Sequence, residues 1–194
     1  MVDMKKIFIL LGHPNNEDTF NKSLADAYEK GAKEAGHEVR RMNLGDMQFD
    51  SVLHKGYKVI QQLEPDLLVF QENIKWCEHF VVIYPTWWTS MPAQLKGLFD
   101  RAWISGFAFR FKPSGLWSKL LVGRSAHVFT TMGAPAIAEC FFFGNVTRLL
   151  KNNLLKFAGF SPVCATWIGN AEKMKIEKRQ RWFAKMEKLG RGGK

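Results

Sequence analysis

The chain alternates short apolar runs with segments of helical spacing, and this alternation limits its fold more than any other feature. Most of the runs are continuously apolar, whereas strands that face water on one side have an apolar residue only at every second position. Continuous runs are typical of strands buried on both faces. The predicted strands are Lys6–Leu11, His37–Asn43, Phe80–Tyr84, Ser125–Thr131 and Val163–Ile168.

The segments between the runs predict helices with recognisable ends. Gly36 is placed to cap the first helix, and Pro65 and Pro92 stand where two others begin. The predicted helices are Phe20–Ala35, Pro65 to about Glu78, Pro92–Trp103, Phe143–Ala158 and Ala171–Leu189. Strands joined by helices form a parallel sheet covered on both faces, with right-handed crossovers. The predicted fold class is therefore α/β: a three-layer, doubly wound, five-stranded parallel sheet with the flavodoxin-like order 2-1-3-4-5.

Length and composition predict one globular domain. The 194 residues contain no repeat or linker, and their hydrophobic fraction of 46% is that of a globular protein. We expect a domain over residues 1–189, followed by a basic, disordered tail at 190–194. No apolar stretch reaches the roughly 18 residues that span a bilayer. Met1–Leu11 lacks the small-residue cleavage site of a signal peptide.

The formal net charge of +10 is concentrated near the end of the chain, where Lys and Arg greatly outnumber Glu over residues 171–194. Such a charge can attract nucleic acid, an anionic membrane or a multiply anionic ligand. It can also belong simply to a solvated final helix, which is the interpretation that we favour. Because no nucleic-acid-binding module is recognisable, we expect no nucleic-acid partner. We also expect no membrane association.

The cysteines indicate a reducing compartment. Cys77, Cys140 and Cys164 are widely spaced and form no Cys-x-x-Cys pair, which disfavours a disulfide framework and a zinc site. We expect all three to be buried, no bound metal, and a cytoplasmic location.

Candidate binding residues follow the first predicted strand, because the loops at the carboxyl ends of parallel strands form the ligand crevice of such folds. The polar donors there belong to His13, Asn15, Thr19 and Asn21. Next to a helix start, these groups suit a phosphate. On residue type alone, Thr19 or Asp18 can equally well cap the helix, and His13 can be an ordinary surface histidine. The sequence has neither a Gly-x-Gly-x-x-Gly fingerprint nor a phosphate-binding P-loop.

The loop after the third predicted strand carries two adjacent tryptophans, Trp87 and Trp88, which follow Pro85 and Thr86. Large aromatic side chains in a surface loop mark a binding surface, so a flat aromatic ligand is the first interpretation. The alternative is that the two indoles pack on a neighbouring subunit or under another loop.

The loop after the fourth predicted strand contains small hydroxyl residues and a glycine, which let main-chain amides approach the edge of a planar ring. Its residues are Thr130, Thr131, Met132 and Gly133. One polar loop and two that can lie against a ring suit a ligand with a phosphate at one end and a ring system at the other. A flavin has this form.

These motifs resemble those of the flavodoxin-fold NAD(P)H:quinone oxidoreductases, a family that includes the modulator of drug activity B proteins and the potassium-efflux ancillary oxidoreductases. The matching motifs are His13-Pro14, Phe20-Asn21, Tyr84-Pro85-Thr86-Trp87-Trp88, Met91-Pro92-Ala93, Lys96-Gly97, Asp100-Arg101, Gly106-Phe107-Ala108-Phe109 and Thr130-Thr131. The resemblance extends over about residues 5–189, and the block from Pro85 to Gly97 is its most specific part.

The resemblance implies an enzyme that transfers hydride from NAD(P)H, through a bound flavin, to a quinone or similar flat acceptor. It names no catalytic side chain, because the flavin carries the chemistry. The family includes both FAD and FMN enzymes, and of the two we favour FAD. The residues implied at the flavin phosphates and ribityl chain are His13, Thr19, Phe20 and Asn21, with Asn15 nearby. Those implied along the isoalloxazine are Pro85, Thr86, Trp87 and Trp88, and those at its pyrimidine edge are Thr130, Thr131, Met132 and Gly133.

The resemblance also implies a homodimer in which a second subunit closes each active site. Phe107, Phe109 and Phe111, expected as exposed aromatics, are candidates for that contact. We nominate Phe107, Phe109, Phe141 and Phe142 as walls of the substrate pocket, and a core or dimer role is an equal alternative for Phe141 and Phe142. The chain departs from the animal enzymes over residues 136–145, which contain neither their tyrosine nor their histidine. It also lacks a clear match to the arginine that meets the adenosine half of their cofactor, and the cations available there are Lys173, Lys175 and Arg179.

Two other functions remain open at this point. A one-electron flavodoxin-type carrier shares the fold, although a net charge of +10 differs from the acidic surface of such carriers. An ancillary or regulatory subunit of a membrane transporter would use the basic final helix as its docking surface.

Overall fold

A parallel sheet of five strands organises the computed structural model, which describes residues 3–15, 17–138 and 144–194. The strands are β1 (Lys6–Leu11), β2 (Glu38–Asn43), β3 (His79–Pro85), β6 (Ser125–Thr131) and β7 (Val163–Ile168). They pair in parallel in the order β2-β1-β3-β6-β7. Counted among the strands of this sheet, that is the predicted order 2-1-3-4-5, so the predicted fold class is confirmed.

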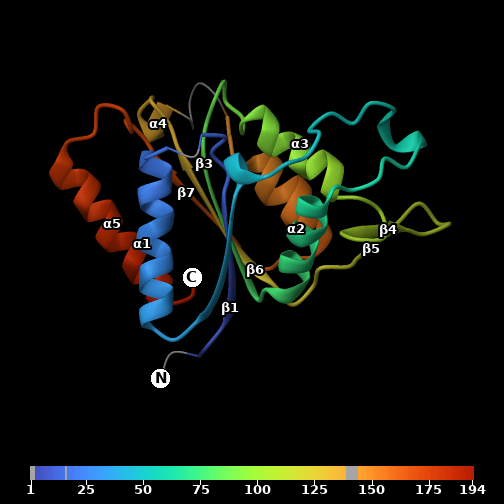
Figure 1. Ribbon diagram of the computed structural model, residues 1–194, viewed down its shortest axis with the longest axis horizontal. Helices are drawn as coiled ribbons and strands as arrows, with labels where there is room; N and C mark the ends of the chain where they lie inside the picture. The colour runs from blue at the N-terminus through green and yellow to red at the C-terminus, as the bar shows by residue number, and fades with distance from the viewer. Residues whose placement is uncertain (1–2, 16, 139–143) are drawn as a thin grey trace.

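Helices cover both faces of the sheet (Figure 1). One face carries α1 (Phe20–Glu34) and α5 (Ile176–Arg191). The other carries α2 (Pro65–Trp76), α3 (Ala93–Ala102) and a π-helical segment, η4 (Leu149–Lys156). The short helical turns are η1 (Leu44–Asp46), η2 (Gly56–Lys58) and α4 (Ala136–Ala138). Among the described helices, none is both long enough and apolar enough to cross a membrane.

Two apolar cores, one on each side of the sheet, explain why the strand sequences are continuously apolar. Every residue of β3 is buried, and successive side chains enter opposite cores. Phe80 lies in the core under α2 and α3, where its ring stacks on Phe8 at a centroid distance of 5.4 Å. Val81 lies in the core under α1 and α5. Because burying each such side chain contributes about 1.5–3 kcal/mol, the burial fixes the strand register.

Helices α1 and α5 pack with their backbones in contact. A Cβ atom added to Gly31 would lie 2.1 Å from the carbonyl oxygen of Glu187, and one added to Gly190 would lie 2.1 Å from the carbonyl oxygen of Tyr28. Only glycine leaves room for this approach. The contact fixes how α5, and the residues that it brings to the carboxyl edge of the sheet, lie against α1.

The end of the chain differs from the disordered tail predicted at 190–194. Helix α5 continues to Arg191, whose guanidinium pairs with Glu34 at 2.6 Å and with Glu187 at 3.2 Å. The hydroxyl of Tyr28 then donates to the carbonyl oxygen of Lys194 at 3.1 Å. These contacts hold the segment against α1. The prediction rested on local composition, which does not show a packing partner.

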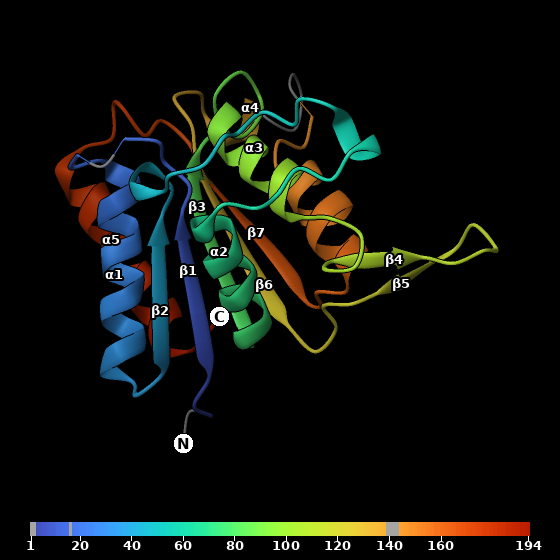
Figure 2. The same ribbon diagram turned by 45° about the vertical axis from the view of Figure 1, so that its right-hand side comes forward.

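Three other elements differ from their predicted form. Helix α5 begins at Ile176 instead of Ala171. The helix predicted over 143–158 is η4, and its predicted first residue lies outside the described part of the chain. The aromatic segment around 107–111 leads into a two-stranded antiparallel hairpin, β4 (Phe109–Phe111) and β5 (Trp117–Lys119), which projects from the molecule (Figure 2).

Residues 50–64 form an arm between β2 and α2 that a buried arginine anchors. The guanidinium of Arg101 donates to both carboxylate oxygens of Glu64, at 2.8 and 3.2 Å. It also donates to the carbonyl oxygens of Asp50 and Gln62. A bidentate carboxylate and two carbonyls satisfy most of the donors of this buried cation. The arm therefore has a defined conformation although it contains little regular structure.

The cysteines match their prediction only in part. Cys77 is buried, and burial raises the pKa of its thiol to about 12. Cys164, in contrast, is exposed, because it lies on β7 at the edge of the sheet. Cys140 lies outside the described residues.

Candidate functional site

Loops from four strand ends meet at the carboxyl edge of the sheet and surround a cavity of about 280 Å³, here called the edge groove. The predicted residues that line it are His13, Thr19, Phe20, Asn21, Pro85, Thr86, Trp87, Thr131, Met132 and Gly133. The structure adds Ala171 and Glu172, which the sequence analysis did not place there, and Arg179, which it named only as a cation available to the adenosine half of the cofactor. The groove therefore joins residues from distant parts of the chain at one place.

His13, after β1, presents a neutral imidazole to the groove. The main-chain N–H of Asn15 donates to its Nδ1 at 3.0 Å, so the neutral ring carries its hydrogen on Nε2. Burial lowers the pKa of His13 below its usual value. His13 thus offers an N–H donor without a charge at neutral pH. Asn15 does not line the groove, and its side chain donates to Glu17 at 3.2 Å.

The start of α1 brings main-chain donors to the groove. Thr19 is the N-cap, and its Oγ1 accepts a hydrogen bond from the N–H of Lys22 at 3.1 Å. Asp18, the alternative cap, pairs with the side chain of Lys22 at 2.8 Å. Within the described part of the chain, the main-chain N–H groups of Phe20 and Asn21 have no acceptor. Unpaired amides at a helix start favour an anion.

Buried polar side chains brace the loops beneath the groove. The side-chain amide of Asn21 donates to Oγ1 of Thr131 at 3.0 Å. The hydroxyl oxygens of Thr86 and Thr130 lie 2.5 Å apart. Thr130 is fully buried and does not line the groove, so it can act there only through Thr86. These bonds tie α1 and the loops after β3 and β6 into one unit.

A tight turn presents the two tryptophans. The main-chain groups of Trp87 and Ser90 exchange hydrogen bonds of 2.9 and 3.0 Å, and Trp88 and Thr89 at the tip have φ values of 48° and 60°. This left-handed conformation costs roughly 1 kcal/mol or more for each residue that is not glycine. Trp87 lies at the groove, edge-on to the ring of His13 at 5.9 Å, whereas Trp88 is 98% exposed and does not line it. Strained backbone that exposes an indole is typical of a functional surface.

The loop after β7 is the part of the groove that the sequence analysis missed. The N–H of Ala171 donates to the carbonyl oxygen of Met132 at 2.9 Å, which places this loop beside the one after β6. The N–H of Gly133 has no acceptor among the described residues. The signal for this loop was available, because it follows the carboxyl end of a predicted strand just as the other three do.

The two predicted pocket phenylalanines that the structure describes, Phe107 and Phe109, do not line the groove. Phe107 is only 6% exposed and packs edge-on against Trp103 at a centroid distance of 5.8 Å. The expectation of an exposed ring was therefore wrong, because the segment folds back into the core under α2 and α3. Phe109 lies in the hairpin, where its ring meets that of Phe157 at 5.2 Å. The other two, Phe141 and Phe142, lie outside the described residues.

A second cavity of about 650 Å³, here called the basic cavity, shares the loop after β7 with the edge groove. Its cations are Lys173, Lys175, Lys178, Arg181 and Lys185. Glu177 is the single carboxylate among the residues that line it, and Trp182 and Met174 add apolar surface. The positive charge noted in the sequence therefore gathers beside the groove.

A model of the protein family described as having a flavodoxin-like fold matches residues 5–189. The chain belongs to this flavodoxin-like family. A Haemophilus influenzae protein named as an uncharacterized NAD(P)H oxidoreductase is 28% identical over 163 residues, which cover 80% of this chain and 79% of that protein. The family match confirms the expected family, and the similarity to this relative confirms the expectation of an oxidoreductase.

Solved structures share the flavodoxin-like fold over nearly the whole chain. An NAD(P)H:quinone oxidoreductase from Methanothermobacter marburgensis superposes with a TM-score of 0.84 at 24% identity, over 99% of this chain and all of that one. An FMN-dependent NADH-azoreductase from Bacillus anthracis, solved in complex with FMN, has a TM-score of 0.71 at 18% identity, over 96% of this chain and 98% of that one. At these identities the likeness establishes the fold.

Proposed function

We propose that the protein is a flavin-dependent oxidoreductase that uses NAD(P)H to reduce quinones or similar flat acceptors. The observation that carries this proposal is the edge groove, which joins a phosphate-type donor set at one end to an indole at the other. The relationship to NAD(P)H oxidoreductases supports the same conclusion.

The donor set of the groove fits a flavin. The free N–H groups of Phe20 and Asn21 suit a phosphate at the start of α1. At the other end, Trp87 offers a flat apolar surface and Gly133 an unpaired N–H for the edge of a ring. A volume of about 280 Å³ is at the small end of ordinary ligand sites, so one chain leaves part of such a ligand uncovered.

The chain's own residues would bind and orient the reactants. When bound, a flavin accepts a hydride from NAD(P)H and passes the two electrons to the acceptor. The Nε2–H of His13 and the N–H of Gly133 are fixed donors, so they need no reorganisation when a ligand binds. Trp87 provides a stacking surface and excludes water. The hydroxyl pair of Thr86 and Thr130 keeps two of the loops in register.

We propose FAD in preference to FMN because of the basic cavity. Asn170 and Lys173 line this cavity and flank the groove residues Ala171 and Glu172 in the loop after β7, where we place the second phosphate and the adenosine of FAD. The lysines of the cavity suit that phosphate, and Trp182 offers an indole against which an adenine can stack. Nζ of Lys185 already lies 4.5 Å from the centroid of this indole.

The proposed function predicts flavin binding by the purified protein. We expect FAD to bind with quenching of its fluorescence, and the loaded protein to oxidise NADPH or NADH anaerobically when menadione is supplied. Trp87→Ala should weaken FAD binding about two- to tenfold, because ring stacking contributes about 0.5–1.5 kcal/mol beyond burial. Trp76→Ala is the matched control, since Trp76 packs under Arg40 on the other face of the sheet. A wild-type protein that binds neither FAD nor FMN refutes the proposal.

We further propose a homodimer that completes each groove. Large apolar side chains are exposed on the arm and on the hairpin, which both project on the α2–α3 side of the molecule (Figures 1 and 2). Ile60 is 92% exposed, Tyr57 72% and Phe111 61%. Exposure of this kind on two neighbouring projections marks an interface, and a second copy of the chain is the partner that also covers the open groove.

The dimer proposal predicts that charge on the arm separates the subunits. We expect the wild-type protein to elute from size exclusion with light scattering as a dimer, and Ile60→Asp to elute as a monomer with weakened FAD binding. Ile176→Asp, at a 70% exposed position on α5, should remain dimeric. A monomeric wild-type protein, or a dimer unaffected by Ile60→Asp, contradicts the proposal.

The proposed location is the cytoplasm. The described cysteines, Cys77 and Cys164, are both free thiols. Free thiols are usual in a reducing compartment, and both NADH and NADPH are cytosolic reductants.

A further inference from the structure

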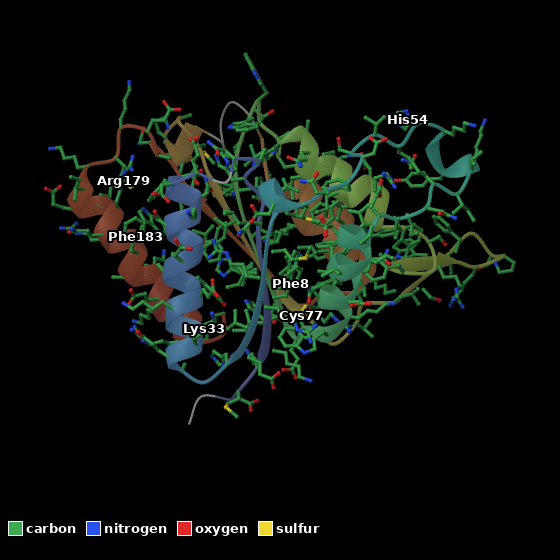
Figure 3. The ribbon with its side chains drawn as sticks, viewed as in Figure 1. Phe8, Lys33, His54, Cys77, Arg179 and Phe183 are labelled. Atoms are coloured by element: carbon green, nitrogen blue, oxygen red, sulfur yellow. The ribbon has the colours of Figure 1, made fainter. Side chains whose placement is uncertain are left out.

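Arg179 stands out in the edge groove because its side chain is fixed on one side and free on the other. Its Nε donates to the carbonyl oxygen of Met174 at 3.3 Å, and its Nη2 donates to that of Ala171 at 3.1 Å. Figure 3 shows Arg179 on α5 about one turn from Phe183, toward the end of the helix where the carboxyl edge of the sheet lies. The side chain of Arg179 therefore joins α5 to the loop after β7.

An aromatic ring holds the guanidinium from another direction. The guanidinium carbon of Arg179 lies 5.1 Å from the ring centroid of Phe20, the first residue of α1. That ring in turn packs on Phe183 at 5.8 Å. Ala171, which accepts a hydrogen bond from Arg179, itself donates to Met132 in the loop after β6. Arg179 thus contacts the loop after β7 and the start of α1 directly, and it is linked to the loop after β6 through Ala171.

The charge of Arg179 is not neutralised within the described part of the chain. Arg41, Arg101 and Arg191 pair with carboxylates, whereas Arg40 and Arg124 are ordered by carbonyl, amide and ring contacts alone, and neither of these two lines the edge groove. Arg179 forms no ion pair with any described carboxylate, and its two carbonyl bonds use only two of its five N–H groups. A fixed cation with free donors in a groove favours an anionic ligand.

We propose that Arg179 binds the phosphate ester of the flavin and thereby sets the preference of the groove for phosphorylated flavins over riboflavin. The inference rests on the proposed function and adds a specificity residue to it. The guanidinium lies over Phe20, where α1 starts and the phosphate-type donors gather. A planar fork whose position is fixed before binding loses little side-chain entropy when it meets a phosphate.

Riboflavin and FMN separate this role from a merely structural one, because they differ only by the phosphate. In fluorescence-quenching titrations of the flavin-free protein, we expect the wild type to bind FMN more tightly than riboflavin. Arg179→Gln should weaken FMN binding about ten- to hundredfold, the range expected for a charge-assisted hydrogen bond, and leave riboflavin binding within about threefold. Arg179→Lys, which keeps the charge but not the fork, should recover part of the FMN affinity. Lys188→Gln removes the same charge from an exposed position on α5 that lines neither cavity, and it should change neither affinity.

The outcomes are distinct. Equal weakening of FMN and riboflavin in Arg179→Gln overturns the proposal and leaves Arg179 as a structural brace only. Unchanged affinities in that variant also overturn it. A wild-type protein that binds neither flavin instead contradicts the proposed function itself, whereas retained riboflavin binding shows that the groove of each variant is intact.

Discussion

Replacing Gly31 with alanine is expected to destabilise the protein by roughly 3 kcal/mol, as overpacking of a tight interface does. The sign of this change in the free energy of unfolding tells whether the glycine stands in free space or in a tight contact. At a helical position with free space, glycine to alanine stabilises by up to about 1 kcal/mol. Here the new Cβ would lie 2.1 Å from the carbonyl oxygen of Glu187, and this atom belongs to a helix backbone that cannot rotate away. Helices α1 and α5 must therefore separate, and Gly190→Ala should have a similar effect because its Cβ would meet Tyr28 in the same way.

Urea unfolding followed by circular dichroism measures this effect. Gly192→Ala is the matched control. Gly192 is the C-cap of α5, its φ is −85°, and the nearest atoms to an added Cβ would lie 3.6 Å away. We expect the control to change the free energy of unfolding by less than about 0.5 kcal/mol, as ordinary surface substitutions do. If Gly31→Ala is as mild as the control, α1 and α5 are not in backbone contact. Because α5 carries Arg179, the two interface variants should also lose flavin affinity, whereas the control should keep it.

The fold could be predicted from the sequence wherever a local pattern reports a tertiary environment. The apolar runs of β1, β3 and β6 are continuous because both faces of these strands are buried, so their sequences show their position in the sheet. The start of α5 was misplaced because residues 171–175 mix charged side chains with Ala171 and the buried Met174, a pattern that fits a first helical turn as well as the loop that is observed. The packing of residues 190–194 was missed because it depends on the contact with α1, to which local composition gives no signal.

The candidate site could be predicted for those loops to which the carboxyl-edge rule for parallel sheets was applied. The carboxyl-edge rule placed residues of three loops at the groove, and the structure brings most of them together. The same rule covers the loop after β7, so Ala171 and Glu172 could have been found as groove residues, whereas Arg179 on α5 was named only as a cation for the adenosine half of the cofactor. The position of Phe107 could not, because burial of an aromatic side chain in an irregular segment depends on how that segment folds back on the core. Likewise, residue type does not distinguish Thr131, which lines the groove, from the buried Thr130 beside it.

Acidification below pH 6.5 is expected to destabilise the protein strongly, because two histidines are buried in their neutral form. Burial lowers the pKa of His79 to about 3, with a smaller contribution from the charge of Lys5, and it lowers the pKa of His127 to about 4. His79 lies against the hydroxyl of Ser125, and the ring of His127 stacks on that of Phe129 at 3.9 Å. In the unfolded chain both rings titrate near pH 6.5. The folded state therefore binds fewer protons than the unfolded state between about pH 6.5 and 4, so the stability present above pH 6.5 is lost as the pH falls.

The slope of this loss identifies its source. Two protons taken up only on unfolding lower the free energy of unfolding by roughly 2 kcal/mol between pH 6 and pH 5, since each contributes about 1.4 kcal/mol per pH unit at full effect. Paired carboxylates such as Asp18 have lowered pKa values, and their contribution is lost only below about pH 4.5, outside this window. Urea titrations at pH 7, 6 and 5 should show His79→Gln reducing the slope by about half. The prediction follows from the burial of His79 beneath the end of α5. If His79→Gln leaves the slope unchanged, the prediction is refuted and His79 is solvated in the native protein.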